Sequence, residues 1–454
     1  MFVHVTQPLF AWGALEDCPS LHSIKALLDA IPDGKLIESL EQARGRGRDD
    51  YPVHVLWGAL VLSVVLRHPS IEACLAELKR NQGLRWLIGI ESETGVPTKW
   101  SMSRFQYVLG QPPHLELLVE VFNKMTARLG EAVEDLGRHC AGDATALHAR
   151  RCTNKQAQAA EQAQGLPQPC GGRKEYTDEQ GRVTQVMEWF GYKLHLLVDA
   201  RHEVALSYTI TSAHGDDAEE FIANVEQAQA NLPKDRIQTA AFDKAADCDK
   251  VHHDLHQKAI KPVVENRRLW KDEHERQLPG HRPDSNIVHD EAGTVYCYDI
   301  KSNPPVRHQM AYIGHEAARG TLKYRCPARH QGWQCPCDAR CNPGKRYGKT
   351  VRIKQERNLR RFPAIPRASK QFERLYKGRT ATERVNARLK LFWGADDGNI
   401  TGAPRFHAYI GAVMVVHSAF ATLLAAAPRY GGILGGTRLG PVQQALQDLF
   451  KKAG

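Results

Sequence analysis

Four polar residues near the C-terminal end of the chain are spaced so that a helix would carry them on one face. They are Tyr376, Arg379, Glu383 and Lys390, separated by three, four and seven positions. On an α-helix, which turns about 100° per residue, their side chains fall within a sector of roughly 60°. A carboxylate flanked by cations suits a site where a metal ion and phosphodiester groups lie side by side. The alternative is a solvated face with an ion pair such as Arg379 with Glu383.

The spacing Y-x2-R-x3-E-x6-K resembles the signature around the catalytic glutamate of DDE transposases from bacterial insertion sequences. All four signature positions match. The resemblance implies that Glu383 is the third acid of a metal-binding triad. It also implies that Arg379 and Lys390 position phosphates, that Tyr376 packs against or bonds the DNA backbone, and that two aspartates elsewhere complete the triad.

Two strand patterns in the middle of the chain supply such aspartates. The run from His139 is predicted to end at Asp143, and the run from Arg236 is predicted to end at Asp243. The neighbouring patterns are strands over 186–199 and 203–211, a helix over 216–230, a helix over 249–259 and a buried strand over 261–264. An aspartate at a strand end is more often ordinary turn chemistry, so the combination with the helix signature carries the inference.

The predicted element order, β-β-β-α-β-α-β, is that of the RNase H-like core that the family shares. The fold class is therefore predicted to be α/β: an RNase H-like mixed-sheet catalytic core, interrupted by an insertion subdomain and preceded by an all-α N-terminal domain. The Gln- and Gly-rich stretch over 153–173 is predicted to be a mobile loop after the first strand.

The surroundings of the second aspartate depart from the family pattern. Members usually read Asp, Lys or Arg, Gly, Tyr, Asp, whereas this chain reads Asp243-Lys-Ala-Ala-Asp247 and places Ala246 where the tyrosine is common. Asp247 and Asp249 are close enough in sequence to be alternative ligands. Asp243 is preferred because it closes the predicted strand.

Domain limits follow from these patterns. The expected parts are a helical N-terminal domain over 1–137 that binds DNA ends or dimerises, the first part of the core over 138–266, an insertion over 267–368, the second part of the core over 369–430 and a tail over 431–454. Helices are predicted over 52–67, over 70–81 with Ser70 as N-cap, from about Ser101, and over 114–136.

The insertion is predicted because 140 residues separate Asp243 from Glu383. It contains four cysteines within sixteen positions, namely Cys326, Cys335, Cys337 and Cys341. Such density is typical of a structural zinc site, but the spacing C-x8-C-x-C-x3-C lacks the paired C-x2-C of a zinc ribbon. The alternatives are a site completed by His330, His315 or Cys297, or reduced cysteines without metal.

A strongly basic stretch over 345–377 leads into the signature helix, and we expect DNA to approach the metal site along it. Its cations include Lys349, Arg352, Lys354, Arg357, Arg360, Arg361, Arg367, Lys370 and Arg374. Arg374 and Lys244 are candidate DNA contacts. Trp270 and Trp393 either stack on an unpaired base or are buried, and burial is favoured.

Composition restricts the class of partner. The 454 residues carry 61 Lys and Arg against 51 acidic residues, a net charge of +10 that favours nucleic acid before an anionic membrane. The N-terminus lacks the pattern of a signal peptide, and the apolar stretches over 52–66 and 409–427 are predicted to be buried helices. The expected location is the cytoplasm, associated with the nucleoid, with no membrane partner.

The resemblance implies DNA transposition with two Mg²⁺ or Mn²⁺ ions as cofactors. Asp143 would be a shared ligand, with Asp243 and Glu383 each completing one ion. Water would cleave the element end, and the released 3′-hydroxyl would attack target DNA. Expected partners are double-stranded DNA, as terminal inverted repeats and as target, and a second copy in a synaptic homodimer. The alternatives are an inactive transposase-derived DNA-binding repressor and a non-transposing nuclease with the same core.

Overall fold

The computed structural model describes residues 19–45, 51–151, 155–163, 165–178, 182–272, 274–282, 285–344, 346–397 and 400–426. The predicted tail over 431–454 and the first 18 residues of the predicted N-terminal domain lie outside these ranges. The N-terminal helices are α1 (Pro19–Ala30), α2 (Gly34–Arg44), α3 (Val53–Val65), α4 (Ile71–Arg80), α5 (Gln82–Leu87), α6 (Lys99–Leu109) and α7 (His114–Ala132). The predicted cap is confirmed, because the Ser70 side chain accepts a hydrogen bond from the Ala73 N–H.

The middle of the chain forms a mixed sheet with β4, β3, β1, β5 and β6 side by side in that order. These strands are β1 (His139–His148), β3 (Val183–Asp199), β4 (Ala205–Ser212), β5 (Thr239–Phe242) and β6 (Lys261–Val264). β3 is antiparallel to β1 and β4, whereas β5 is parallel to β1 and β6. Helices α9 (Asp217–Asn231) and α10 (Asp249–Gln257) connect β4 to β5 and β5 to β6. The predicted order of these elements is confirmed.

Asp143 does not end its strand, contrary to the prediction. β1 continues to His148 because it pairs with β3 over almost its whole length. Gly142 resembles a turn signal in the sequence, but it is required by packing. A Cβ atom at this position would lie 2.7 Å from the rings of Phe221 and Phe242. Asp143 therefore points to the opposite face of the sheet, in the middle of a strand.

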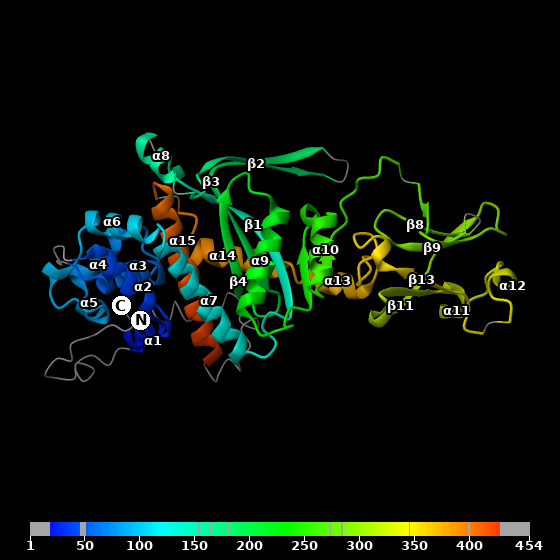
Figure 1. The fold of residues 1–454 in the computed structure, drawn as a ribbon, viewed down its shortest axis with the longest axis horizontal. Helices are drawn as coiled ribbons and strands as arrows, with labels where there is room; N and C mark the ends of the chain where they lie inside the picture. Colours follow the sequence, from blue (N-terminus) through cyan, green and yellow to red (C-terminus); the bar gives the residue numbers. More distant parts are fainter. Residues whose placement is uncertain are drawn as a thin grey trace.

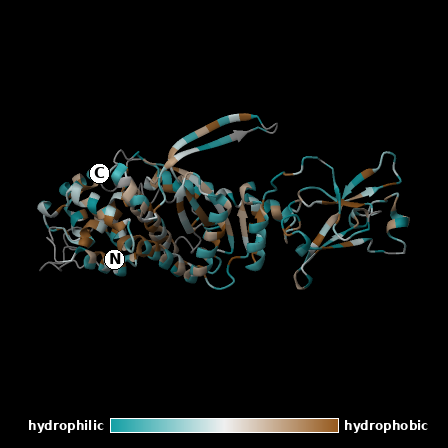
Figure 2. Cartoon of the chain, turned by 45° about the horizontal axis from the view of Figure 1, so that its top comes forward, coloured by the Kyte–Doolittle hydropathy of each residue, from teal (hydrophilic) through white to brown (hydrophobic). Residues whose placement is uncertain are grey.

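The predicted mobile loop over 153–173 is also wrong for the residues that the structure describes there. Helix α8 spans Lys155–Ala163, and strand β2 spans Cys170–Thr177. β2 pairs with residues 183–191 of β3, and the two form an arm that extends away from the central strands (Figures 1 and 2). β2 is a strand because it pairs with β3, and the composition of residues 153–173 gives no sign of this pairing.

Two hydrophobic clusters cover the faces of the sheet. The face that carries Asp143 shares one cluster with the N-terminal helices, α14 (Thr380–Trp393) and α15 (Ala403–Ala426). The opposite face packs against α9 and α10. α15 is long and apolar enough to cross a membrane, but 67% of its most apolar window is buried inside the protein, which is typical of a core helix.

Residues between β6 and α13 (Lys370–Lys377) form two small sheets around a hydrophobic cluster of their own. The strands are β7 (Arg276–Gln277), β8 (Ile287–His289), β9 (Val295–Asp299), β10 (Val306–Gln309), β11 (Ala311–Glu316), β12 (Thr321–Arg325) and β13 (Thr350–Lys354). Short helices α11 (Pro327–Gln331) and α12 (Asp338–Cys341) lie between β12 and β13. This part stands apart from the central sheet in Figure 1.

A buried carboxylate ties both ends of this segment to the central sheet. Asp247, shortly after β5, has a side chain that is 0% exposed. It accepts hydrogen bonds from Arg360 and Arg367, each at 2.8 Å, from the Arg267 backbone N–H at 2.8 Å and from His252 at 3.0 Å. Burial alone would raise the pKa of Asp247, but these donors and the two guanidinium charges hold it at about 2.

We expect Asp247→Ala to lower the free energy of unfolding by about 3–5 kcal/mol, because the two arginines would lose their buried anion. Asp249→Ala is the matched control, since Asp249 is exposed in the first turn of α10 and its loss should cost less than about 1 kcal/mol. Urea unfolding followed by circular dichroism measures both. Equal midpoints for the two variants would contradict the role of Asp247.

The pH dependence of this contribution has a defined sign. The pKa of Asp247 is lower in the folded protein than its ordinary value of 3.8, so the folded state favours the ionised form. The stabilisation is complete above about pH 4 and is lost as the pH falls toward about 2. The difference in unfolding midpoint between wild type and Asp247→Ala should shrink over this interval.

Candidate active site

The four signature residues lie on two helices rather than one. Tyr376 is near the end of α13, Arg379 immediately precedes α14, and α14 carries Glu383 and Lys390. The N–H groups of Gly378 and Arg379 bond to carbonyls three residues back, which tightens the chain out of α-helical geometry. The prediction of one continuous helix face is therefore wrong at this break. Arg379 and Glu383 remain neighbours at 3.5 Å.

Asp143 has the most strongly perturbed environment of the three acids. Its side chain is 20% exposed, and Oδ1 lies 3.8 Å from the Arg379 guanidinium. Burial raises the pKa of Asp143 to about 6. The charges of Arg379 and Lys174 oppose this rise, and that of Asp243 adds to it. The carboxylate is therefore incompletely compensated, a state that a bound cation would relieve.

Asp243 directly follows β5, as predicted. Its Oδ1 accepts a hydrogen bond from the Ala245 N–H at 2.8 Å. It lines a cavity of about 780 Å³ with Lys244 and with Glu265, the residue after β6. Tyr376 reaches the same edge of the sheet, because its hydroxyl donates to Glu265 at 2.9 Å. Burial and the Glu265 carboxylate raise the pKa of Tyr376 to about 12.

The Arg379 guanidinium lies among the three predicted acids. It contacts Asp143 and Glu383, and although burial lowers its pKa, the charges of both and of Asp243 raise it overall. The acids thus converge from β1, the end of β5 and α14. In the described part of the chain, no three His, Cys, Asp or Glu side chains are placed to hold one metal ion. The common neighbour of the three acids is the Arg379 guanidinium.

Asn386 is a neighbour of Asp143 that the sequence prediction missed. Its Nδ2 lies 3.5 Å from Asp143 Oδ2, and its side chain is 8% exposed. Its Oδ1 is buried without a hydrogen-bond partner, which costs free energy unless a water or ligand satisfies it. The sequence did contain a signal, since Asn386 follows Glu383 by three positions and so shares its helix face.

Neither alternative to Asp243 fits the site. Asp247 is buried and saturated by Arg360, Arg367 and its other donors, so its carboxylate cannot also hold an ion at the edge of the sheet. Asp249 begins α10, is exposed, and is not among the residues that line the cavity beside Asp243.

The predicted DNA-contacting cations separate into two groups. Lys244 and Arg374 are exposed, and Lys244 lines the cavity beside Asp243. Lys390 is instead bound within the protein: its ammonium donates to the Ala146 carbonyl of β1 at 2.5 Å and lies 3.3 Å from Asp396. Lys390 therefore fixes α14 against β1.

The basic stretch over 345–377 is not a continuous path for phosphates. Arg360 and Arg367 are buried against Asp247, so the expectation is wrong for both. The guanidinium groups of Arg276 and Arg361 lie 4.0 and 4.4 Å from the centroid of the half-buried Trp270 ring, so both arginines pack over this tryptophan. Trp393 is 1% exposed, which confirms its predicted burial.

The cysteines between β6 and α13 lie near one another but, among the described residues, are not placed to hold a metal ion. The Cys337 thiol donates to Asp299 at 3.0 Å. Burial raises the pKa of Cys297 to about 12, and three nearby thiols contribute, namely Cys326, Cys335 and Cys341. No metal-binding group of three forms among the side chains that are described. The zinc site stays a prediction, which metal analysis of the purified protein tests.

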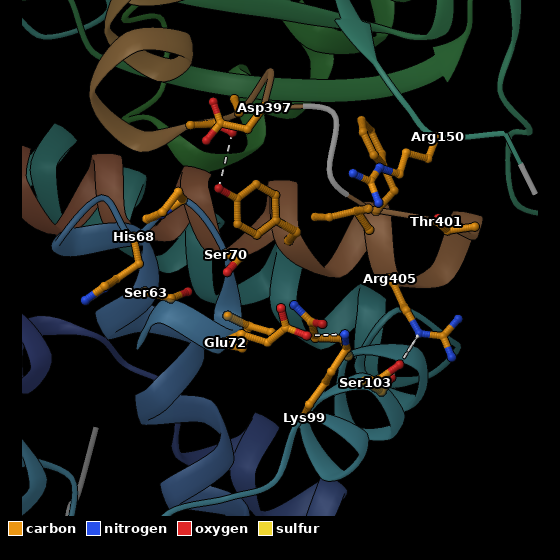
Figure 3. Close-up of a pocket in the computed structure, with 18 of the residues that line it drawn as sticks. Ser63, His68, Ser70, Glu72, Lys99, Ser103, Arg150, Asp397, Thr401 and Arg405 are labelled. Carbon is orange, nitrogen blue, oxygen red and sulfur yellow. Dashed lines mark hydrogen bonds and ion pairs between the residues drawn. The ribbon is translucent and has the colours of Figure 1, made fainter. Parts of the chain in front are cut away.

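A second cavity, of about 500 Å³, lies where the N-terminal helices meet the end of β1 and the start of α15. Figure 3 shows Glu72 and Lys99 pointing toward each other in it. Arg67 pairs with Asp397, and Arg405 donates to a carbonyl and a hydroxyl of α6. Because these polar groups satisfy one another, we place the chemistry at the carboxylates of the sheet.

A mixed α/β sheet with a helical N-terminal region and converging acids is consistent with an RNase H-like DDE domain, the class of polynucleotidyl transferases. The sequence matches the family model of the Transposase DDE domain over residues 163–418 and that of a Transposase domain (DUF772) over 15–107. The chain belongs to the DDE transposase family. The first match includes Asp243 and Glu383 and begins after Asp143. A comparison with curated proteins finds no match.

The raised pKa of Asp143 predicts that Asp143→Asn stabilises the metal-free protein near neutral pH. The pKa in the folded state lies above the ordinary 3.8, so ionisation of Asp143 costs stability as the pH rises from about 4 to about 6. In EDTA at about pH 7.5, the variant should gain up to about 3 kcal/mol, and at about pH 4 the difference should vanish. Urea unfolding at both values is the measurement.

Magnesium provides an internal control for this comparison. It should raise the unfolding midpoint of wild type more than that of Asp143→Asn, because the variant lacks the anionic oxygen. A wild-type protein that is more stable than the variant in EDTA near neutral pH would contradict the interpretation.

Proposed function

We propose that this transposase performs metal-dependent phosphodiester cleavage at the ends of its element and joins the released 3′-hydroxyl to target DNA. The observation that supports this most is the convergence of Asp143, Asp243 and Glu383, from three separate segments, around Arg379. The chain also carries the Y-x2-R-x3-E-x6-K signature. Divalent ions bound by such carboxylates activate water and stabilise the attacking and leaving oxygens.

The residues present fit Mg²⁺ or Mn²⁺ in their chemistry, because both ions prefer oxygen ligands. Asp143 has a charge that its surroundings compensate poorly, and Asn386 adds a buried oxygen without a partner. Glu383 is 59% exposed and its contact to Arg379 is long, so a change of rotamer can bring it toward the aspartates while α14 stays in place. Asp143 would be the shared ligand, with Asp243 and Glu383 each completing one of two ions.

Arg379 exchanges partners in this proposal. It is the counter-ion of the acids in the free protein, and its planar guanidinium suits a phosphate of the cleaved strand once the acids are neutralised. Lys244 and Arg374 contact phosphates further from the cut. Tyr376 stays on Glu265 and borders the DNA backbone. Lys390 acts through its contacts to β1, which keep α14 in position.

The remaining parts take the roles expected from the sequence. Residues 1–137 bind the DNA ends or dimerise, and residues 267–368 form a subdomain inserted between the two parts of the core, 138–266 and 369–430. Two copies handle two element ends in a synaptic homodimer. The alanine at position 246, where tyrosine is common in the family, gives no support to an inactive protein. Ala246 is 0% exposed and belongs to the hydrophobic cluster beneath α9 and α10, so the departure concerns the packing below the site.

Glu383→Gln should reduce cleavage of a duplex carrying the element's terminal repeat by at least about 10²-fold in Mg²⁺, because a neutral amide is a poor ligand for a hard cation. The folded state and DNA binding should be retained, since Glu383 is exposed. Gel analysis of the nicked strand measures cleavage. Asp249→Asn is the control and should cut like wild type.

The outcomes separate the three candidate activities. Cleavage that survives Glu383→Gln would remove Glu383 from the proposed triad. A wild-type protein that binds the repeat but never cuts it would favour the repressor. Cleavage without joining of the 3′-hydroxyl to a second duplex would favour a nuclease that does not transpose.

A further inference from the structure

Glu265, the residue after β6, is a further carboxylate on the face of the sheet that carries Asp143. Three apolar residues lie side by side across β1, β5 and β6 and belong to the same hydrophobic cluster, namely Ala141, Ala241 and Val263. Faces alternate along a strand, so the residues two positions further on face the same side. These residues are Asp143, Asp243 and Glu265. Glu265 therefore extends the row of the two aspartates by one strand.

Two contacts fix the Tyr376 side chain above this row. Phe372, one turn earlier on α13, is 8% exposed and stacks on the Tyr376 ring with centroids 5.6 Å apart and planes 10° from parallel. This contact sets the plane of the ring. The hydroxyl end is held by Glu265, which accepts its hydrogen bond at 2.9 Å. Glu265 thus ties α13 to the end of β6.

The Tyr376 ring in turn borders Arg379. The guanidinium carbon lies 5.9 Å from the ring centroid, near the outer limit of the range in which an aromatic face attracts a cation. The other charged contacts of Arg379 are Asp143 at 3.8 Å and Glu383 at 3.5 Å. Both of these acids are proposed ion ligands. The ring is therefore the neighbour of Arg379 that has no part in binding ions.

We infer that Glu265 is a positioning residue, which keeps Arg379 over the carboxylates by holding Tyr376. The inference rests on the proposed function, in which Arg379 leaves Asp143 and Glu383 for a phosphate of the cleaved strand. Glu265 keeps its partner in that exchange, because a phenol donates a hydrogen bond whether or not the other acids are neutralised. The Tyr376 ring then holds the guanidinium beside the phosphate when the acids no longer do.

A double-mutant cycle on cleavage of the terminal-repeat duplex in Mg²⁺ is the first test. Glu265→Ala and Tyr376→Phe should each cut about tenfold more slowly, because a small misplacement in a catalytic site costs rate steeply. The double variant should be no slower than either, since both changes remove one contact. Glu265→Gln should restore most of the rate, because its amide oxygen also accepts from Tyr376. Glu373→Ala is the matched control, since Glu373 is an exposed acid of α13 that pairs with Lys377.

Binding and unfolding supply readouts that need no cleavage. The probe is a duplex that ends at the terminal repeat in a 3′-deoxynucleotide, so that it can be bound but not joined, titrated in Mg²⁺ at a series of salt concentrations. Arg379→Gln should lower the slope of log affinity against log salt by about one. Glu265→Ala should lower it equally, and Glu265→Gln should keep the wild-type slope. Mg²⁺ should raise the unfolding midpoint of Glu265→Ala as much as that of wild type.

Each outcome decides a separate point. Equal salt slopes for wild type and Glu265→Ala, or additive losses of rate in the double variant, would overturn the inference even where wild type cuts normally. A slow Glu265→Gln with a smaller midpoint shift in Mg²⁺ would make Glu265 an ion ligand and the inference wrong. A midpoint of Glu265→Ala far below that of Glu373→Ala in EDTA would assign the contact to folding. A wild-type protein that does not cut would contradict the proposed function, while the slopes would still decide whether Glu265 positions Arg379.

Discussion

The buried Asp247 carboxylate holds together the two points at which the chain leaves the central sheet and returns to it. It binds the Arg267 N–H where the chain leaves the central sheet, and Arg360 and Arg367 where it returns. Closing so long a segment is opposed by chain entropy, and this cluster offsets that cost by holding both ends beside β5. α13 and α14 follow the returning arginines, and contacts such as that of Lys390 with the Ala146 carbonyl then hold α14 against β1.

Asp143 and Asp247 are both at least partly buried, but their pKa values are shifted in opposite directions. Asp247 has two arginines, a histidine and an N–H group, and its pKa is lowered to about 2. Asp143 has one guanidinium at 3.8 Å and the charge of Lys174, which do not offset its burial and the charge of Asp243, and its pKa is raised to about 6. A carboxylate such as Asp247, whose oxygens already accept hydrogen bonds and whose charge is paired, serves a structural role. One such as Asp143 retains the capacity to bind a cation, which is why the proposed chemistry lies at Asp143 although Asp247 is the more deeply buried of the two.

Local patterns predicted the strand and helix order around the central sheet, because alternation and helical periodicity report which faces are buried. They also placed Asp243 directly after β5. They failed where a distant partner decides the structure. β2 is a strand because residues 183–191 pair with it, and Asp143 lies inside β1 because β3 extends that strand. Arg360 and Arg367 resembled solvated charges, since their partner lies 113 and 120 positions away. The roles of the three acids stay predictions.

The shared hydrophobic cluster limits how the protein can adapt to DNA. The N-terminal helices, α15 and the sheet face bearing Asp143 pack into one core, so a hinge between them would expose apolar surface. Phe406 of α15 stacks on Tyr192 of β3 with ring centroids 4.2 Å apart. His417 accepts a hydrogen bond from the Ala205 N–H at 3.0 Å, and burial, which lowers its pKa to about 3, keeps it neutral for that purpose. The N-terminal helices and α15 are therefore held in a fixed position against the sheet face that carries Asp143.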